Sequence, residues 1–458
     1  MSFRSMPLGM LVGMLVLGAS RVASAQEATL DNGDNAWVLT CSALVLFVTA
    51  PGLAMCYGGL VRRKNVLGVI MQCLFLMGLM TVVWGLWGYS LAFGGSVGEP
   101  GYHAWIGNTD YLGMRDVAAS WSTAENRAIL PMEGRVPRLT HMVFQGMFFI
   151  VTPVLICGGF AERMRFSAMA TFMLLWGTFV YCPLCHWVWD GGILAFGSPH
   201  ALMGGVLDFA GGTVVHVSSG VSALVMALFM GKRLGFGQED MRPHNLTYTA
   251  IGSAMLWVGW FGFTGGSRLA ADGVAASAFV ATHFAAAAGA LAWVLVEWRM
   301  TGKPSVLGAA SGIVAGLVCI TPGSGFVGPM AAMGMGAIAG IICFFACTKL
   351  KRAFRYDDSL DAFGVYGVAG ICGVLLTGVF ASRAISNVAN GAPLGWLEGG
   401  SILLGQLGAI AVTVVFTITA TLIICVILNT IMRVRIDPEG EFIGLDQWEH
   451  GEEGYILH

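Results

Sequence analysis

His216 is an ionisable residue inside a long apolar stretch, Asp208–Met230. Charge is costly within a membrane-spanning segment, and ionisable groups there usually face a cavity or a partner. Because an imidazole titrates at about 6.5 and has two nitrogens, it could pass a proton or bond a small amine. A hydrogen bond between two packed helices would also explain a histidine here. The residue alone leaves both interpretations open.

Asp208 stands at the start of the same stretch, eight residues before His216. That spacing is a little over two helical turns, so both residues fall near one face of one helix. A carboxylate at a helix start is stabilised by free backbone N–H groups and by the helix dipole. We therefore expect Asp208 to act indirectly, through the shape and electric field of the site.

Cys182-Pro183-Leu184-Cys185-His186 fits the Cys-x-x-Cys-His pattern of c-type haem attachment. The match is short, the chain has eleven cysteines, and no second axial ligand is evident. A haem-bearing membrane redox protein is therefore only a third hypothesis. We expect the cysteines to be small core residues, and we expect no cofactor and no metal site.

Aromatic side chains gather near the ends of several apolar stretches, among them Phe144, Phe148, Trp189 and Phe263. An aromatic face attracts a dehydrated cation by about 0.5–2 kcal/mol. Phenylalanines four residues apart also pack along a helix, and tryptophans also line membrane interfaces. Composition does not choose between a cation site and ordinary packing.

The composition is that of a membrane protein, because 56% of the 458 residues are hydrophobic and 11% are charged. Soluble domains carry about 25% charged residues. The net charge of −2 gives no reason to expect nucleic-acid binding. Residues 1–25 fit a signal peptide, with Arg4, an apolar centre at Leu8–Gly18 and the small residues Ala23-Ser24-Ala25. A retained first helix is the alternative.

Residues 26–431 fit one all-α transmembrane domain of eleven helices, and the polar residues 432–458 fit a tail on its inner side. The apolar stretches are Ala36–Leu60, Val66–Phe93, Thr140–Phe160, Phe166–Cys185, Asp208–Met230, Leu246–Gly266, Ala276–Glu297, Ser305–Ile320, Phe326–Leu350, Phe363–Phe380 and Ser401–Ile431. The Ser305–Ile320 stretch is short and suits a tilted or partly buried helix.

Basic residues predict the orientation, because cytoplasmic loops are enriched in lysine and arginine. With the N-terminus outside, the inner loops hold Arg62, Arg63, Lys64, Arg163, Arg165, Lys232, Arg233, Arg242, Arg299, Lys303, Lys349, Lys351, Arg352, Arg355, Arg433 and Arg435. The outer loops hold only Arg115, Arg127, Arg135, Arg138, Arg268 and Arg383. We therefore expect the C-terminus inside, in the cytoplasmic membrane of a bacterium-like cell.

Two segments hint at an inverted repeat of five helices, followed by a final helix. Asp208-Phe209-Ala210-Gly211 opens the fifth stretch, and Asp361-Ala362-Phe363-Gly364 opens the tenth, with Tyr366 just inside. The two stretches would cross the membrane in opposite directions, so an inverted repeat would bring them together near the midplane. Ordinary helix capping is the alternative.

The segment Asp208-Phe-Ala-Gly-Gly-Thr-Val-Val-His216-Val-Ser-Ser-Gly resembles the signature of the ammonium transporter family that includes the Rhesus proteins. Other resembling segments occur in family order across most of the chain: Phe144–Phe148, Ala161–Ser167, Gly231–Arg233, Gly259–Phe263 with Ser267, Gly302–Ser305 and Gly444–Glu452. The resemblance implies a homotrimer, not an enzyme, with one pore in each subunit.

By that resemblance, Phe144, Trp189 and Ser267 match an outer ammonium-recruiting site. Phe148 and Phe263 match a stacked gate beneath it, and Asp208 matches a supporting carboxylate. His216 matches the first of two pore histidines. The resemblance also implies a PII-type signalling protein as a partner of the tail.

The chain departs from the family pattern at Tyr366, where the second pore histidine would stand. Tyrosine titrates near 10 and is a poorer acid or base than histidine, although its hydroxyl can hydrogen-bond. We expect that hydroxyl to contact His216. Asp190 replaces a usual glycine, and the stretch between Trp189 and Asp208 is longer than usual. Ammonium transport is the leading hypothesis, and an ammonium sensor on the same scaffold is the second.

Overall fold

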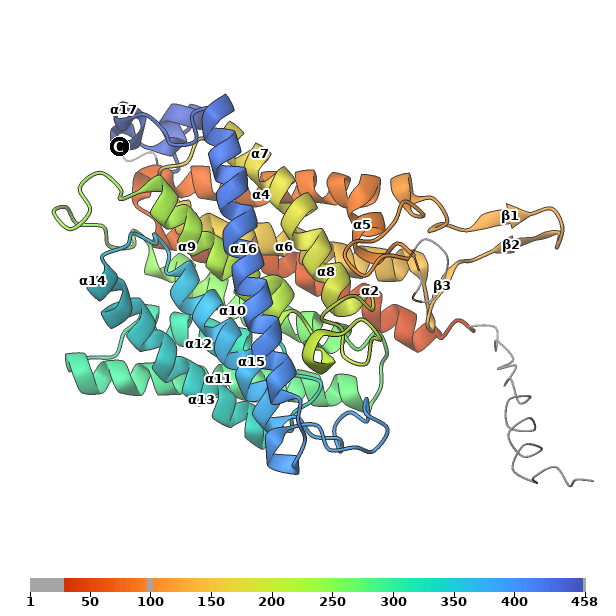
Figure 1. Cartoon of the computed structure of the whole chain (residues 1–458). Coiled ribbons are helices and arrows are strands. Elements are labelled where there is room, and N and C mark those ends of the chain that lie inside the picture. The colour runs from red at the N-terminus through yellow and green to blue at the C-terminus, as the bar shows by residue number, and fades with distance from the viewer. Residues whose placement is uncertain (1–28, 96, 98–101, 456–458) are drawn as a thin grey trace, which may run out of the picture.

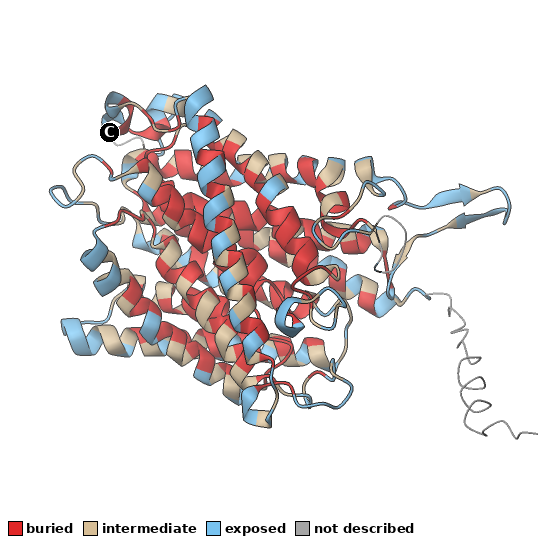
Figure 2. Cartoon of the chain, in the orientation of Figure 1, coloured by how far each residue is buried: buried red, intermediate tan, exposed pale blue. Residues whose placement is uncertain are grey.

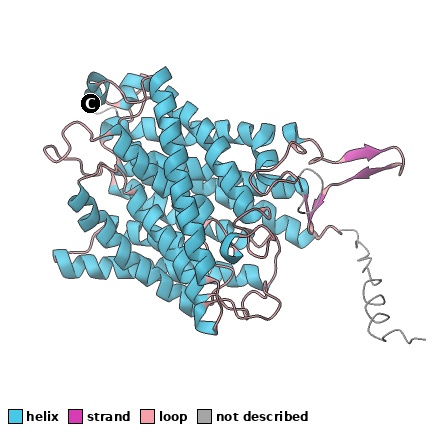
Figure 3. Ribbon diagram, viewed as in Figure 1, coloured by secondary structure: helices cyan, strands magenta, loops and turns pink. Residues whose placement is uncertain are grey.

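The computed structural model describes residues 29–95, 97 and 102–455, which form a bundle of helices (Figure 1, Figure 3). The predicted signal peptide, 1–25, lies outside the described residues. Two small antiparallel hairpins are the strands of this part of the chain. One pairs β1 (Ser120–Ser122) with β2 (Arg127–Ile129), and the other pairs β3 (Met132–Glu133) with β4 (Val136–Pro137). The all-α prediction therefore omits only these two short hairpins, which belong to a loop.

Nine helical segments in the described residues are long and apolar enough to cross a membrane. In chain order they are Asn32–Leu60 (α2, η1 and α3), Arg63–Phe93 (η2, α4, η3 and α5), Arg138–Phe160 (α6), Phe166–Trp189 (α7, η5 and α8), Gly212–Met230 (η7 and α9), Gly273–Thr301 (α11), Pro329–Phe354 (α13, η8 and α14), Phe363–Phe380 (η9 and α15) and Leu403–Ile431 (α16).

Two more helices complete the eleven predicted stretches. The helix α12 (Val306–Ile320) has 15 residues and rises only about 22 Å, less than the roughly 30 Å of a bilayer core. The helix α10 (Leu246–Gly266) is longer but contains several glycines and threonines, so it does not rank among the nine. A multi-pass helical membrane protein is confirmed, whereas the count of eleven spans includes one helix that is short, α12, and one that is less apolar, α10.

Burial follows the expectation for a protein surrounded by lipid (Figure 2). Helices α6 and α9 pack against each other in the interior, and most of each is buried. Helix α16 lies at the periphery and exposes large apolar side chains such as Leu404, Val415 and Ile431. An exposed apolar helix of this kind suits contact with lipid or with another subunit.

Glycines let α11, α12 and α13 pack closely. A Cβ on Gly316 of α12 would lie 2.3 Å from the carbonyl oxygen of Ala285, and one on Gly336 of α13 would lie 2.1 Å from the same oxygen. Both distances are impossible for real carbon atoms, so the backbones approach only because side chains are absent. Such small-residue contacts are a common way for membrane helices to associate.

The openings of α9 and α15 lie side by side, as the repeat hypothesis expects. Each begins with a π-helical turn, η7 (Gly212–Val217) and η9 (Phe363–Gly367), and the two turns contact each other. The carboxylate that caps the second turn is Asp358, which accepts the N–H of Phe363 at 2.8 Å. Asp361 instead pairs with Lys351 at 2.6 Å, so the matching of Asp361 with Asp208 is wrong.

Candidate functional site

A cavity of about 250 Å³ brings three predicted site residues together. Phe148, Trp189 and Ser267 all line it. Sequence analysis singled out Asp190, beside Trp189, as a departure from the pattern the chain resembles, but it did not place the other lining residues there: Phe93, Glu133, His141, Gln145, Phe209 and Leu269. Phe144 is not among the lining residues and packs behind Phe148, with ring centroids 5.1 Å apart. The cavity thus combines one tryptophan, one hydroxyl and two carboxyl groups.

Ser267 offers a lone pair to the cavity. Its Oγ lies 2.9 Å from the carbonyl oxygen of Phe263, so the hydroxyl proton is donated to that carbonyl. An oxygen that has donated its only proton still accepts hydrogen bonds. A ligand with N–H groups would find an acceptor at this oxygen.

Trp189 is fixed by its own hydrogen bond. The indole Nε1 donates to the carbonyl oxygen of Asp208 at 2.9 Å. The edge of Phe148 packs near it, with a centroid distance of 5.8 Å and an interplanar angle of 75°. Because the indole is held at its polar edge, its aromatic face stays available to the cavity, where a cation would bind.

The carboxylate of Asp208 is buried, and it accepts its hydrogen bonds from three consecutive residues, 211–213. Its Oδ1 accepts the N–H groups of Gly211 and Gly212 at 2.8 and 2.6 Å, and its Oδ2 accepts the N–H of Thr213 at 2.7 Å. The hydroxyl of Thr213 also donates to Oδ2. The carboxylate thus satisfies the free N–H groups that begin η7, which fits the indirect role expected from the sequence.

Phe148 and Phe263 meet beneath the cavity. Their ring centroids are 4.5 Å apart, and their planes are inclined at 56°. Both side chains are buried. The two rings pack against each other, but they are tilted and do not stack in parallel as the gate expectation had it.

Beyond these rings, His216 lies in a row of nearly parallel aromatic planes. It faces Trp260 at 5.5 Å and 14°, Phe263 at 5.9 Å and 18°, and Tyr366 at 6.4 Å and 17°. The imidazole is fully buried. Trp260 was not among the predicted site residues, because an indole in an apolar stretch carries no distinctive spacing.

Thr321 determines the tautomer of His216. The threonine hydroxyl donates to the carbonyl of Leu317 at 2.8 Å and accepts the indole N–H of Trp260 at 3.0 Å. His216 Nε2 lies 3.2 Å from the same oxygen and must therefore be the donor. Nδ1 is then the unprotonated nitrogen, and it has no hydrogen-bond partner within the described residues. A buried, unpaired acceptor remains for a ligand or for water.

Tyr366 approaches His216 as predicted, but not through its hydroxyl. The two rings lie face to face, and the hydroxyl of Tyr366 lies near that of Tyr57. Tyr57 donates its own proton to the carbonyl of Leu155 at 3.2 Å. The expected bond between Tyr366 and His216 is wrong, because the hydroxyl extends past the imidazole towards Tyr57.

His186 has both ring nitrogens occupied. Nε2 lies 2.7 Å from the carbonyl oxygen of His103, and Nδ1 lies 3.2 Å from the carbonyl oxygen of Ala92 and 2.9 Å from Asp190 Oδ2. No nitrogen is left to bind haem iron. Cys182 and Cys185 are buried thiols, as the core interpretation expected. These contacts contradict the haem hypothesis.

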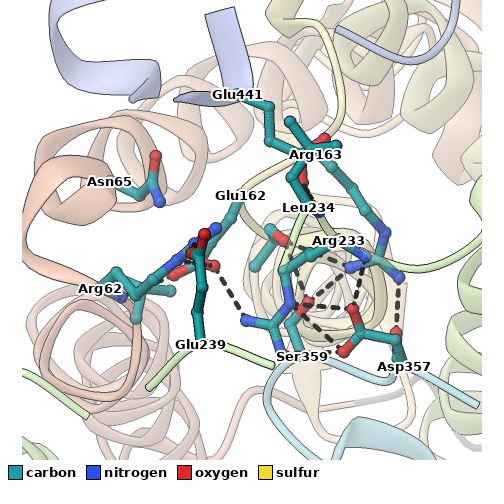
Figure 4. A network of polar contacts seen from close by, with 12 residues as sticks. Arg62, Asn65, Glu162, Arg163, Arg233, Leu234, Glu239, Asp357, Ser359 and Glu441 are labelled. Atoms are coloured by element: carbon teal, nitrogen blue, oxygen red, sulfur yellow. Dashed lines mark hydrogen bonds and ion pairs between the residues drawn. The ribbon is translucent and has the colours of Figure 1, made fainter. Parts of the chain in front are cut away.

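A second cluster of polar contacts joins residues of several loops (Figure 4). Arg233 donates to both carboxylate oxygens of Asp357, with Nη2 to Oδ1 at 2.8 Å, and to Glu162 at 2.9 Å. Arg62 also donates to Glu162, at 2.9 Å. Arg163 donates to the carbonyl of Asp357 at 2.6 Å. Sequence reasoning used these arginines for orientation, and Arg163 and Arg233 also for the family resemblance, but it did not expect them to form one cluster.

Burial and charge oppose each other in this cluster. Burial alone would raise the pKa of Glu162, but Arg233 and Arg62 hold that pKa below its usual value. In the same way Arg233 holds the pKa of Asp357 below its usual value against the effect of burial. Asp358 lacks such a partner, and burial raises its pKa to about 6 although Lys351 opposes the shift. Two of the three carboxyl groups are thus kept charged by arginine.

The C-terminal segment folds back onto this cluster through α17 (Pro438–Ile443) and η11 (Asp446–His450). Glu441 accepts the N–H of Leu234 at 2.6 Å and Arg435 Nη2 at 2.8 Å. Further bonds join Leu445 N to Asn65, Gly68 N to Asp446, and His244 to Tyr455. The tail therefore covers the loops after α3 and α9 and the start of α4.

Comparison with known proteins is consistent with this geometry. Residues 36–455 match the model of the Ammonium Transporter Family. The chain is 43% identical to an ammonium transporter of Bacillus subtilis over 92% of this chain and 98% of that protein. Its fold is similar to the crystal structure of Saccharomyces cerevisiae Mep2, with a TM-score of 0.78, 34% identity and 90% and 92% of the two chains covered. A structure described as a sensor Amt protein gives a TM-score of 0.78 at 26% identity, covering 92% of this chain and 98% of that one. The chain belongs to the ammonium transporter family.

Proposed function

We propose that this protein carries ammonium across the membrane through the row of residues that leads from the outer cavity to His216. The observation that carries the proposal is the cavity formed by Trp189, Ser267 and Phe148. An indole face and a hydroxyl lone pair replace part of the water that ammonium gives up. The Bacillus subtilis relative, named an ammonium transporter, supports the same substrate.

Beyond the cavity, Phe148 and Phe263 form the gate that ammonium passes. A dry, aromatic passage disfavours charge, so ammonia separates from its proton there. The unpaired Nδ1 of His216 is the acceptor available in this passage. Phe144 supports the gate from behind, and Asp208 keeps Trp189 and the start of η7 in place.

An ammonium sensor is the second candidate. The reason to consider it is Tyr366, which stands where a second pore histidine would be expected. With one histidine in the passage, a proton has fewer imidazole nitrogens to move along than it would have with two, so its transfer should be less efficient. The likeness to the structure described as a sensor Amt protein favours the same idea. Binding without transport would identify a sensor.

Uptake of radiolabelled methylammonium into proteoliposomes separates the two candidates. A transporter should show uptake above empty liposomes, and Trp189→Ala with Ser267→Ala should weaken the apparent affinity by about tenfold or more. Trp121→Ala, at an exposed tryptophan of the outer hairpin, is the matched control and should behave like the native protein. Saturable binding with no uptake would reject transport and leave the sensor.

The topology completes the proposal, with the N-terminus outside and residues 432–458 in the cytoplasm. The proposal also includes a signal peptide at residues 1–25 and eleven helices in an inverted repeat. It further includes a homotrimer that assembles through exposed apolar faces. Protease access to the tail in sealed cells and in inverted vesicles would test the orientation. Chemical cross-linking in native membranes would test the trimer.

A PII-type protein is the proposed partner of the tail. Arg435, Glu441 and Asp446 tie that segment to loops on the same side, so its position depends on what binds there. A pull-down of the host's PII protein should recover more with the intact chain than with one that ends at residue 436. Equal recovery would remove the tail from the interface.

A further inference from the structure

We propose that Asp190 is a cation-binding residue of the outer cavity, whose carboxylate, positioned by His186, attracts the ammonium that Trp189 and Ser267 receive. The proposal rests on the proposed function and adds a specificity-determining residue to the same site. Asp190 follows α8 directly, and its side chain is about one-fifth exposed and lines the cavity. It therefore lies where a cation enters.

His186 Nδ1 and Asp190 Oδ2 lie 2.9 Å apart, a distance that suits an ion pair, although Asp190 Oδ2 has no hydrogen bond of good geometry within the described residues. Nε2 of His186 faces the carbonyl of His103, and Nδ1 faces only oxygens, namely those of Ala92 and Asp190. A carbonyl oxygen accepts but never donates, so Nε2 carries a hydrogen. The proton that neutralises this pair lies either on Nδ1, beside a carboxylate, or on Asp190, beside a neutral imidazole. In both forms the pair is neutral overall.

The other titratable groups of the cavity leave the His186–Asp190 pair as the main source of negative charge for a bound cation. The second carboxyl group, Glu133, has Arg138 Nε 3.8 Å away, which offsets much of its charge. His141 Nε2 faces the amide nitrogen of Gln145, which can only donate, so this ring is neutral. When the His186–Asp190 pair loses the proton that neutralises it, the cavity gains one negative charge, and a cation restores neutrality.

The pKa of the Asp190 carboxyl lies within the pH range over which uptake is measured. Burial raises the pKa of its carboxyl to about 6, against the opposing effect of His186. Above that pH the carboxyl is charged, so cation binding should tighten as pH rises from 5 to 7.5. The titratable and charged groups around it are Tyr89, Tyr102, Tyr111, Glu133, Arg138, His141, Cys185 and His186.

The test measures methylammonium uptake and its KM in proteoliposomes at pH 5, 6, 7 and 7.5. An alkylammonium titrates like lysine, at about 10.4, so it stays protonated throughout. Asp190→Asn should raise KM about tenfold at pH 7.5 and less than about twofold at pH 5, since a unit charge a few ångströms away has an effect of this order. Asp190→Glu should keep the pH dependence.

Glu125→Gln is the control, because Glu125 is an outer carboxylate paired with Arg127 on the hairpin and away from the cavity. It should leave KM unchanged at every pH. If native protein and Asp190→Asn both carry methylammonium with the same KM at pH 7.5, the inference is overturned. A KM raised equally at all pH values would also overturn it, because that pattern reflects altered structure. Absence of uptake by the native protein would instead overturn the proposed function.

Discussion

Asp208 contacts Trp189 and the start of η7 through different atoms. Its backbone carbonyl accepts the indole N–H at 2.9 Å, while its carboxylate accepts the N–H groups of Gly211, Gly212 and Thr213. The residue therefore joins the aromatic wall of the cavity to the helix that carries His216. A disturbance of the carboxylate reaches both.

Replacing Asp208 with asparagine should lower stability and affinity together. The amide has one acceptor oxygen in place of two, so at least one buried donor loses its partner. Loss of a charge-assisted bond of this kind costs about 1.5–3 kcal/mol. Thermal unfolding in detergent should show the loss, and methylammonium KM should rise. Asp110→Asn, at an exposed loop residue, is the control, and a loss no larger than the control's would contradict the role.

Thr321→Val should impair transport with little change in shape. Valine has nearly the same volume, but it leaves Nε2 of His216 and Nε1 of Trp260 without an acceptor. Two unpaired buried donors cost about 2–6 kcal/mol. We expect a lower unfolding temperature and an uptake rate reduced at least tenfold. Thr413→Val, at a buried threonine of α16, is the matched control, and equal rates for the two variants would refute the assignment.

Tyr366→Phe should leave transport nearly unchanged. The hydroxyl is directed to Tyr57, so its removal spares the contacts of His216 with Thr321. We expect a stability loss of about 1 kcal/mol and an uptake rate within about twofold of the native rate. A rate lowered tenfold in a correctly folded variant would show that the hydroxyl itself takes part in proton passage. Tyr366→His tests the sensor, because only a sensor should gain uptake from it.

Asp357→Asn should destabilise the protein in a pH-dependent way. It removes the charge that pairs with buried Arg233, at a cost of about 3–5 kcal/mol. Because Arg233 holds the pKa of Asp357 below its usual value, the stabilisation is present above the unfolded pKa of about 3.9. It is lost as pH falls through the lower folded pKa.

The pH profile gives the measurement for this pair. The difference in unfolding temperature between native protein and Asp357→Asn should be large at pH 7 and should shrink below pH 4. Asp240→Asn breaks an exposed pair with Arg242 and should cost at most about 1 kcal/mol. A difference that does not vary with pH would show that the carboxylate's charge is not what stabilises the fold.

Hydropathy predicts the spans because a bilayer requires about 20 consecutive apolar residues. It locates α6, α9 and α16 well. It says less about α10, whose glycines and threonines suit a packed helix as well as a lipid-facing one.

The site is harder to predict, because its contacts join distant segments. Motif resemblance leads to Trp189 and Ser267, but nothing in the sequence marks Thr321 as the partner of His216. The four-residue spacing of His186 and Asp190 was readable, yet the neighbouring cysteines suggested haem instead. Tyr366 was placed correctly beside His216, but its hydroxyl was not, since ring orientation depends on Tyr57.

The tail contacts have a consequence for biosynthesis. Asp446 bonds to Gly68 and Leu445 bonds to Asn65, across 378 and 380 residues of sequence. The ribosome makes those tail residues after every helix of the bundle, so the loops that the tail covers remain open to solvent and to proteases until the tail has been made. A chain that stops early, by truncation or by a premature stop codon, keeps its helices but presents these loops to the quality-control machinery.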